Sequence, residues 1–220
     1  MGRIRSFYSS MVGKKAVMGV TGLIGVVFVI LHSLGNLLIF QGSTALNSYS
    51  RLLKSSAELL WALRIILIVA VTLHVIAAVQ LTRQSRAARP HGYVKHEAQA
   101  ATIASRTMRW GGALLLVFIV FHILHFTTGT IRPAGVFSHE DVYTNVVTSF
   151  RIWWVALFYV VSMIALGFHL FHGAWSSVRS IGVSPASPRP LQHRLSLAIA
   201  VLVWAAFTAV PVAVFSGLVR

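Results

Sequence analysis

Residues 16–40 read AVMGVTGLIGVVFVILHSLGNLLIF, an apolar run without a single Lys, Arg, Asp or Glu. About 20 predominantly apolar residues suffice for a helix to cross the hydrocarbon core of a bilayer. The basic segment before the run resembles the start of a signal peptide. The run is too long for the apolar region of such a peptide, and no small-residue cleavage site follows it. We therefore expect a retained membrane-spanning helix.

Four further apolar runs follow, separated by short polar connections. They predict an all-α integral membrane protein, a single transmembrane domain over residues 1–220, with five spans at about 15–40, 60–82, 108–129, 152–176 and 195–217. The composition agrees, because 56% of the residues are hydrophobic and only 10% are charged, against about 25% charged in soluble domains. The absence of cysteine excludes disulfides, a thiolate-held iron–sulfur cluster and covalent haem attachment in this chain.

The basic residues indicate an orientation. Most of the 19 lysines and arginines lie in the amino-terminal tail and in the second and fourth connections, which are on one side of the predicted membrane. The positive-inside rule puts that side, with the amino terminus, in the cytoplasm and the carboxy terminus outside. The net charge of +15 is then an orientation signal and a source of lipid and partner contacts, rather than a sign of nucleic-acid binding.

Histidines are concentrated in the predicted spans. Six of the ten lie there: His32, His74, His122, His125, His169 and His172. Ionisable residues in the hydrocarbon region are costly and usually face the bundle interior, where they serve a function. A lone histidine could be a packing residue, but six across the first four spans point to a shared function.

Depth sorts four of these histidines into two pairs. At about 1.5 Å rise per residue, His32 and His122 lie about 26 and 21 Å from the cytoplasmic starts of their helices, towards the outer side. His74 and His169 lie about 21 and 26 Å from the outer starts of theirs, towards the cytoplasm. Two histidines from different helices at one depth can clamp a haem iron. The sequence therefore predicts two haem groups in a bundle of the first four helices, with the histidine-free fifth helix outside it.

The remaining two histidines leave alternatives open. His125 and His172 each follow a candidate ligand by three residues on a neighbouring part of the same helix. Either could replace the chosen ligand, act behind it or contact a quinone. Glycines on the first and fourth spans, Gly19, Gly22, Gly25, Gly167 and Gly173, would let a flat cofactor or a neighbouring helix approach closely.

Several of these segments resemble a known family. The segment HSLGNL at residues 32–37, preceded by Gly13-Lys14-Lys15 and followed by Asn47-Ser48-Tyr49, is similar to the cytochrome b membrane anchor of succinate dehydrogenase and fumarate reductase. The segment FHLFHGAW at residues 168–175 and the pair Phe121-His122 look like further motifs of that family. The resemblance covers about residues 10–180 and is closest to the single-chain, five-helix, two-haem type.

The resemblance implies that His32 and His122 ligate an outer haem b, and that His74 and His169 ligate an inner one. It implies a flavoprotein subunit and an iron–sulfur subunit as partners, menaquinone as the membrane substrate, and a place in the bacterial cytoplasmic (inner) membrane. The basic connection from Arg83 to Arg109, with His91 and His96, would be a docking surface for those subunits. The candidates for quinone contacts or for support of the ligands are Ser10, Lys15, Arg109, His125, His172 and Trp175.

One departure concerns proton movement. Some family members are proposed to move protons through glutamates within the membrane, but the only acidic residues here lie outside the predicted spans: Glu58, Glu97, Glu140 and Asp141. Glu58 could serve a quinone at the outer side, although a solvated helix-start carboxylate is the favoured explanation. Two other functions also fit the histidines: a di-haem b subunit of a formate dehydrogenase or hydrogenase, and a transporter with a histidine-lined path.

Overall fold

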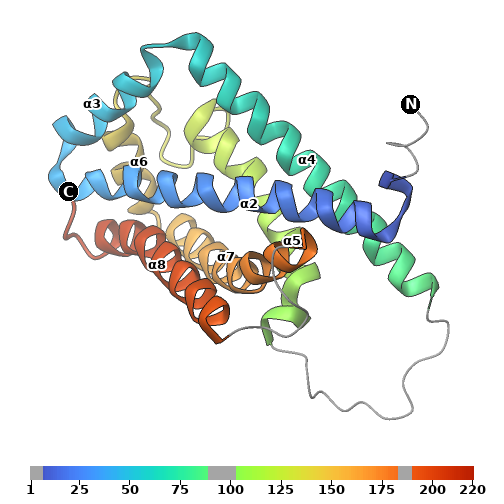
Figure 1. Cartoon of the computed structure of the whole chain (residues 1–220). Coiled ribbons are helices and arrows are strands. Elements are labelled where there is room, and N and C mark those ends of the chain that lie inside the picture. The colour runs from blue at the N-terminus through green and yellow to red at the C-terminus, as the bar shows by residue number, and fades with distance from the viewer. Residues whose placement is uncertain (1–6, 89–102, 183–189) are drawn as a thin grey trace.

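The described parts of the chain, in a computed structural model, are residues 7–88, 103–182 and 190–220. They form helices and short connections without any strand (Figure 1). In chain order the helices are α2 (Met11–Asn36) with the 3-10 turn η1 (Leu37–Gln41), α3 (Ser43–Lys54), α4 (Ala57–Ala87), α5 (Ile103–His122) with the π-helical turn η2 (Ile123–Thr127), α6 (Val142–Phe150), α7 (Trp153–Ser180) and α8 (Pro190–Phe215). Because His91 and His96 lie outside the described residues, only the two ends of the basic connection are placed.

Among the described residues, five helices are long and apolar enough to cross a membrane: Met11–Gln41, Ala57–Ala87, Ile103–Thr127, Trp153–Ser180 and Pro190–Phe215. The predicted all-helical, five-span character is confirmed.

Some of the expected helix boundaries are wrong. The second helix runs past Arg83 to Ala87, and the third begins at Ile103, before Arg106 and Arg109. Arginine does not end a helix in either place, because its long apolar stem lets the charged group reach water from a helical position.

The fifth helix also begins earlier than expected. It starts at Pro190 instead of after Arg194. Proline suits the first helical position, where its missing N–H would have no partner within the helix and its fixed φ is already helical. The predicted start of this span, at about residue 195, was therefore too late.

Two short helices, α3 and α6, lie in segments expected to be connections, and both lie at the carboxy-terminal end of the molecule (Figure 1). The side chain of Asn47 joins them, because its Nδ2 donates to Asp141 Oδ1 (2.9 Å) and its Oδ1 accepts from the Tyr143 N–H (3.0 Å). Asp141 also caps α6 by accepting from the Thr144 N–H. The Tyr143 hydroxyl donates to the carbonyl of Arg220, so one polar network ties α3, α6 and the last residue together.

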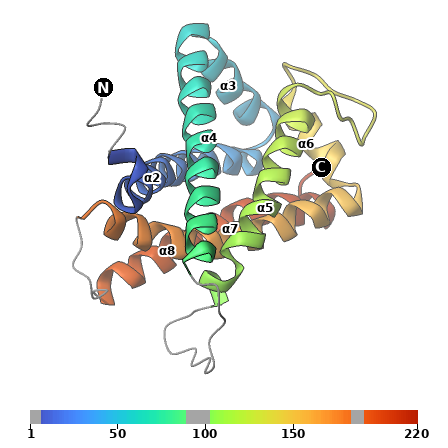
Figure 2. The ribbon, with the colours of Figure 1, turned by 90° about the vertical axis from the view of Figure 1, so that its right-hand side faces the viewer.

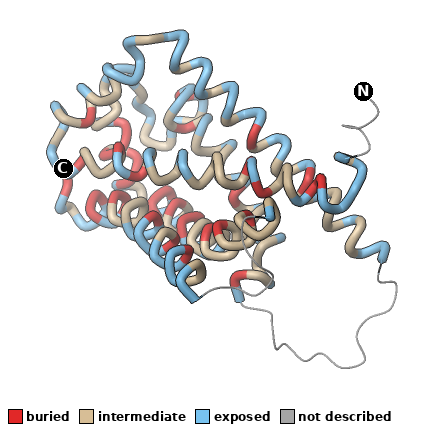
Figure 3. The backbone as a smooth tube through the Cα atoms, in the orientation of Figure 1, coloured by how far each residue is buried: buried red, intermediate tan, exposed pale blue. Residues whose placement is uncertain are grey.

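The long helices pack around a central pair, α2 and α7. Helix α4 lies against α2, α5 lies against α7, and α8 lies along α7 with a smaller contact to α2 (Figure 2). Gly19 allows the central contact, since a Cβ there would be 3.2 Å from the Ser177 carbonyl oxygen. Most of α4 is exposed in Figure 3, and Ala70 and Ala77 are its buried residues.

The larger buried cluster lies at the end where α6, α7 and α8 meet. It is built mainly from aliphatic side chains, together with aromatic ones that include Phe150 and Tyr159. Phe118, Phe121 and Phe126 pack on it from α5 and η2. This cluster fixes the direction of the π-helical turn that carries His125.

Candidate functional site

The structure brings the rings of both predicted histidine pairs together. The centroids of His32 on α2 and His122 on α5 are 5.9 Å apart, with an angle of 82° between the ring planes. Those of His74 on α4 and His169 on α7 are 6.1 Å apart, at 59°. Each of four helices thus supplies one ring, and each pair joins helices that are far apart in the sequence.

The separation of the rings suits a shared metal atom. An imidazole nitrogen bonds a metal at about 2.0–2.1 Å and lies about 1.1 Å from its ring centre, so two rings on opposite sides of one metal have centroids about 6 Å apart. Both observed separations agree with this value to within a few tenths of an ångström. The angle between the planes is free, because each ring can turn about its bond to the metal. The centroid separations are therefore compatible with a metal atom between the two rings of each pair.

Glycines leave space on the faces that carry these histidines. Gly25 lies two helical turns from His32 on the same face of α2, and Gly173 lies one turn from His169 on α7. A Cβ added at either glycine would meet no atom within 4 Å. A flat, bulky group beside the histidines is compatible with these faces, so the residues present fit a haem.

The inner pair has glycines directly against its rings. A Cβ at Gly22 would be 3.3 Å from Cε1 of His74, and one at Gly112 would be 3.8 Å from Cε1 of His169. A larger side chain at Gly22 would have to displace the His74 ring. Close approach of the α2 backbone is therefore part of how the His74 ring is placed.

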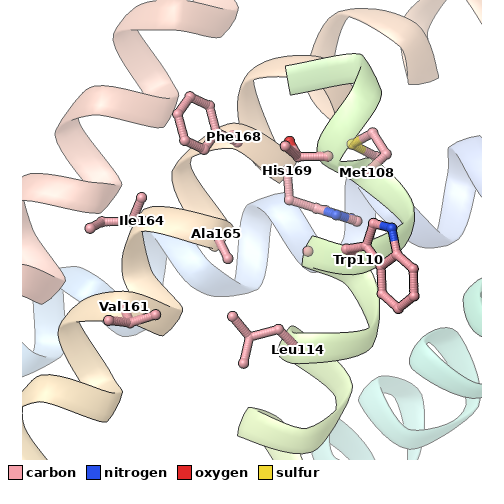
Figure 4. Close-up of a pocket in the computed structure, with 10 residues that line it drawn as sticks. Met108, Trp110, Leu114, Val161, Ile164, Ala165, Phe168 and His169 are labelled. Atoms are coloured by element: carbon pink, nitrogen blue, oxygen red, sulfur yellow. The ribbon is translucent and has the colours of Figure 1, made fainter. Parts of the chain in front are cut away.

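An apolar cavity of about 310 Å³ lies between α5 and α7, with His169 in its wall. Figure 4 shows the His169 ring reaching from α7 towards α5. The other lining residues are almost all apolar, among them Met108, Trp110, Leu114 and Phe168. Such a wall suits the edge of a macrocycle or a quinone ring, both of which are largely apolar.

One ring of each pair is held by hydrogen bonds. Nδ1 of His74 lies 3.1 Å from the Met18 carbonyl oxygen and 3.3 Å from the Thr21 hydroxyl. A carbonyl can only accept, so Nδ1 carries the hydrogen and Nε2 is left with a free lone pair. Nδ1 of His122 lies 3.4 Å from the Tyr159 hydroxyl. Metal-binding histidines are commonly held in this way through their second nitrogen.

The other ring of each pair is held by packing. The His32 ring stacks on Phe28, with centroids 5.2 Å apart, and lies 5.6 Å from the ring of Phe207 on α8. Nδ1 of His169 is buried without a hydrogen-bond partner. The fifth helix thus lies on the flank of α7 and α2, yet one of its aromatic side chains reaches the outer pair.

His125 uses both ring nitrogens within the protein. Nδ1 lies 3.0 Å from the Tyr159 hydroxyl and Nε2 lies 2.9 Å from the Ser149 hydroxyl. In this arrangement neither nitrogen is left for a metal, so the structure presents His125 as a neighbour of His122 and not as its rival.

His172 has a different environment. Its Nδ1 is buried without a partner. Its ring lies 5.4 Å from that of Trp175, and the guanidinium of Arg179 lies over the same indole. His172 therefore keeps a free nitrogen next to a broad aromatic surface.

The remaining candidates are not gathered around His172. The hydroxyl of Ser10 caps α2, accepting from the Gly13 N–H and donating to the Phe7 carbonyl. Lys15 and Arg109 are exposed. In the described ranges no hydrogen bond or ring contact joins any of these three to His172 or Trp175. The neighbouring Lys14 is buried, and its ammonium group donates to the Ser9 carbonyl.

The sequence reasoning missed the side chains that hold or flank the rings: Thr21, Ser149, Tyr159 and Phe207. Polar groups inside apolar spans seek partners, so Thr21 and Tyr159 could have been singled out as polar. Nothing in their spacing pointed to His74 or His122, because these contacts join different helices.

A scan against protein-family models and searches of curated proteins and of solved structures found no match to the chain. Among the described residues there is no group of three or more His, Cys, Asp or Glu side chains arranged to hold a metal ion. A haem iron needs only two side-chain ligands, because its macrocycle supplies the others. The two histidine pairs are therefore the candidate functional site.

Proposed function

We propose that this chain is the di-haem cytochrome b membrane anchor of a succinate:quinone oxidoreductase. The observation that carries the proposal is the pairing of four histidines from four helices into two pairs, with ring centroids 5.9 and 6.1 Å apart. The choice of this complex rests on the resemblance of the histidine-bearing segments to that family. When bound, the two haems would supply one-electron transfer between an iron–sulfur subunit and menaquinone.

The four histidines would hold the haem groups in this proposal. His32 and His122 would hold the outer haem, and His74 and His169 would hold the inner one. Two imidazoles leave no open position on the iron, so the site carries electrons and does not activate oxygen. Helices α2, α4, α5 and α7 would each supply one histidine to the two sites, and α8 packs along α7 beside them.

The distance between the pairs suits a path through the membrane. The His74 ring lies against Gly22, and His32 lies ten residues further along the same helix. At about 1.5 Å per residue, the two sites are about 15 Å apart along α2. The hydrocarbon core is about 30 Å thick, which leaves one site for each half of the bilayer.

The basic residues set the direction of this path. With the amino terminus in the cytoplasm, the inner pair faces the side with most of the positive charge. Exposed Arg83 and Arg86 end α4 there, and exposed Arg106 and Arg109 begin α5. This basic end is the proposed docking surface for the flavoprotein and iron–sulfur subunits, in a bacterial cytoplasmic membrane.

The inner end also supplies the best candidates for a quinone contact. His172 has a buried nitrogen without a partner, and it lies beside Trp175. A quinone carbonyl accepts hydrogen bonds, and its ring packs on aromatic surfaces. His172 and Trp175 are therefore favoured over Ser10, whose hydroxyl is already used by the helix cap.

The deciding experiment is a reduced-minus-oxidised visible spectrum of the complex purified in detergent, with a haem count per chain. Two haem b groups are expected, and the absence of haem bands would reject every cytochrome function and favour a transporter. His74→Ala or His169→Ala should remove one haem and keep the other. The matched control is His139→Ala, at an exposed histidine outside the spans, which should keep both.

The identity of the complex needs a separate measurement. The proteins that co-purify with the chain distinguish a succinate dehydrogenase from a formate dehydrogenase or a hydrogenase. A flavoprotein that oxidises succinate is the expected partner. Co-purification of a formate- or hydrogen-oxidising subunit would keep the haem assignment and reject the named complex.

A further inference from the structure

Three buried polar side chains, joined by hydrogen bonds, lead away from His122. The Tyr159 hydroxyl on α7 lies 3.4 Å from Nδ1 of His122 and 3.0 Å from Nδ1 of His125. On the far side of the His125 ring, Nε2 lies 2.9 Å from the Ser149 hydroxyl on α6. Tyr159, His125 and Ser149 are 6%, 3% and 4% exposed. These hydrogen bonds thus connect α7, η2 and α6 inside the larger hydrophobic cluster.

The donors along this series of hydrogen bonds have one consistent order. A histidine that binds a metal through Nε2 carries its hydrogen on Nδ1, so His122 Nδ1–H donates to the Tyr159 oxygen. The Tyr159 hydroxyl then donates to Nδ1 of His125, which leaves the His125 hydrogen on Nε2 to be donated to Ser149. The three hydrogen bonds from His122 to Ser149 therefore all run in one direction. Hydrogen bonds aligned in this way strengthen one another.

Local structure holds His125 in its place within this series. It lies in the π-helical turn η2, where the Thr128 N–H donates to the Ile123 carbonyl five residues earlier. Such turns are rare and occur frequently at functional sites. The ring of Phe126 stacks on that of His125, with centroids 3.9 Å apart, and Phe121 packs on it at 5.3 Å. The His125 ring is therefore fixed in orientation as well as hydrogen-bonded.

We propose that Tyr159 and His125 are positioning residues that set the orientation and the electron density of His122. The inference rests on the proposed function, because it assumes that His122 binds the outer haem iron. A tyrosine oxygen that accepts from Nδ1–H makes the imidazole a stronger electron donor. A stronger donor stabilises the oxidised iron and lowers the reduction potential of that site.

The two pairs differ in how they can be tested. The inner ring, His74, is held by a backbone carbonyl and by Thr21, and no side-chain substitution removes the carbonyl. Within the described residues, the Tyr159 hydroxyl is the one hydrogen-bond partner of the outer ring, His122. The proposal therefore predicts that loss of this one hydroxyl changes the outer site and leaves the inner site unchanged.

The test is a redox titration of the purified complex, wild type against Tyr159→Phe, followed by visible and electron paramagnetic resonance spectra. The potential of one haem should rise by an amount equal to about a tenfold change in its reduction equilibrium, 59 mV for one electron. The other haem should not change. Tyr143→Phe is the matched control, because its hydroxyl bonds the Arg220 carbonyl instead of a histidine. Unchanged potentials for both haems in Tyr159→Phe would overturn the proposal.

Variants of His125 give a second readout that does not depend on removing the tyrosine. The amide of His125→Gln can still accept from Tyr159 and donate to Ser149, so it should keep the outer potential near the wild-type value. His125→Leu can do neither and should shift the potential in the direction of Tyr159→Phe. Equal reduction potentials of the outer haem in the two variants would overturn the proposed role of His125. A wild-type chain that lacks haem would reject the proposed function as well, whereas a two-haem chain without these shifts would reject this inference alone.

Discussion

Gly22 on α2 lies directly against the imidazole of His74 on α4, so that a Cβ at Gly22 would be 3.3 Å from Cε1 of the ring. The same Cβ would be 3.3 Å from the Ser177 hydroxyl of α7. Three helices therefore meet at a position where only a glycine avoids a tight contact. Because the Met18 carbonyl, one turn earlier on α2, holds the adjacent Nδ1 of the ring, His74 has little freedom to move away.

Gly22→Ala should weaken the inner haem site and leave the outer one intact. The added methyl group presses on the His74 ring, and a small displacement of a ligand is costly because metal geometry is strict. The measurement is the haem count with a redox titration, in which the inner haem should be lost or shifted. Ser177→Ala removes the second close contact, so the double variant Gly22→Ala/Ser177→Ala should recover part of the loss. An unchanged inner haem in Gly22→Ala would show that the glycine is not needed for ligand placement.

Gly25→Leu tests whether the open face of α2 is a cofactor surface. No protein atom lies within 4 Å of a Cβ at Gly25, so the larger side chain should leave the apoprotein folded. Substitutions that remove no contact usually change stability by about 0.5 kcal/mol or less. Haem content should nevertheless fall, because the leucine would fill space on the face of His32. Val27→Leu, on an exposed part of the same helix, is the control and should keep both haems. Full haem content in Gly25→Leu would place the cofactors elsewhere.

The histidine pairs could be predicted because depth in a membrane follows from residue number once the spans are known. The five apolar runs gave the helices, and alternating helix direction assigned each histidine to a side. The helices α3 and α6 were missed because tertiary contacts stabilise them. Asn47 bridges to α6, and the Tyr49 ring packs so closely on Gly35 that a Cβ there would be 2.6 Å from it. These contacts explain what Gly35, Asn47 and Tyr49, which belong to the family-like segments, do in the fold. The contacts join distant parts of the chain, so no local sequence pattern reveals them.

Asp141 should make the stability of the outer end depend on pH. Hydrogen bonds from Thr144 and Asn47 hold the pKa of its carboxyl below the ordinary value of 3.8. A group with a lowered pKa in the folded state stabilises the protein above its unfolded pKa, and that contribution is lost as the pH falls through the folded pKa. In thermal unfolding, Asp141→Asn should therefore be less stable than wild type near neutral pH. The difference should shrink below about pH 4.

The neighbouring Glu140 supplies the control for that experiment. It is exposed, and its carboxylate accepts no hydrogen bond from the described residues. Glu140→Gln should follow the wild-type stability at each pH. A difference between wild type and Asp141→Asn that stays constant down to acid pH would mean that the charge of Asp141 does not contribute.

The orientation of the chain can be tested by labelling, because the sequence contains no cysteine to interfere. Ser55, between α3 and α4, and Ala87, at the far end of α4, are both exposed and lie at opposite ends of one spanning helix. The arginines near Ala87 predict that its end is cytoplasmic. In intact cells, a membrane-impermeant maleimide should label Ser55→Cys and should label Ala87→Cys only after the membrane is opened. The reverse pattern would invert the orientation, and it would put the His74–His169 pair on the outer side, away from the proposed iron–sulfur partner.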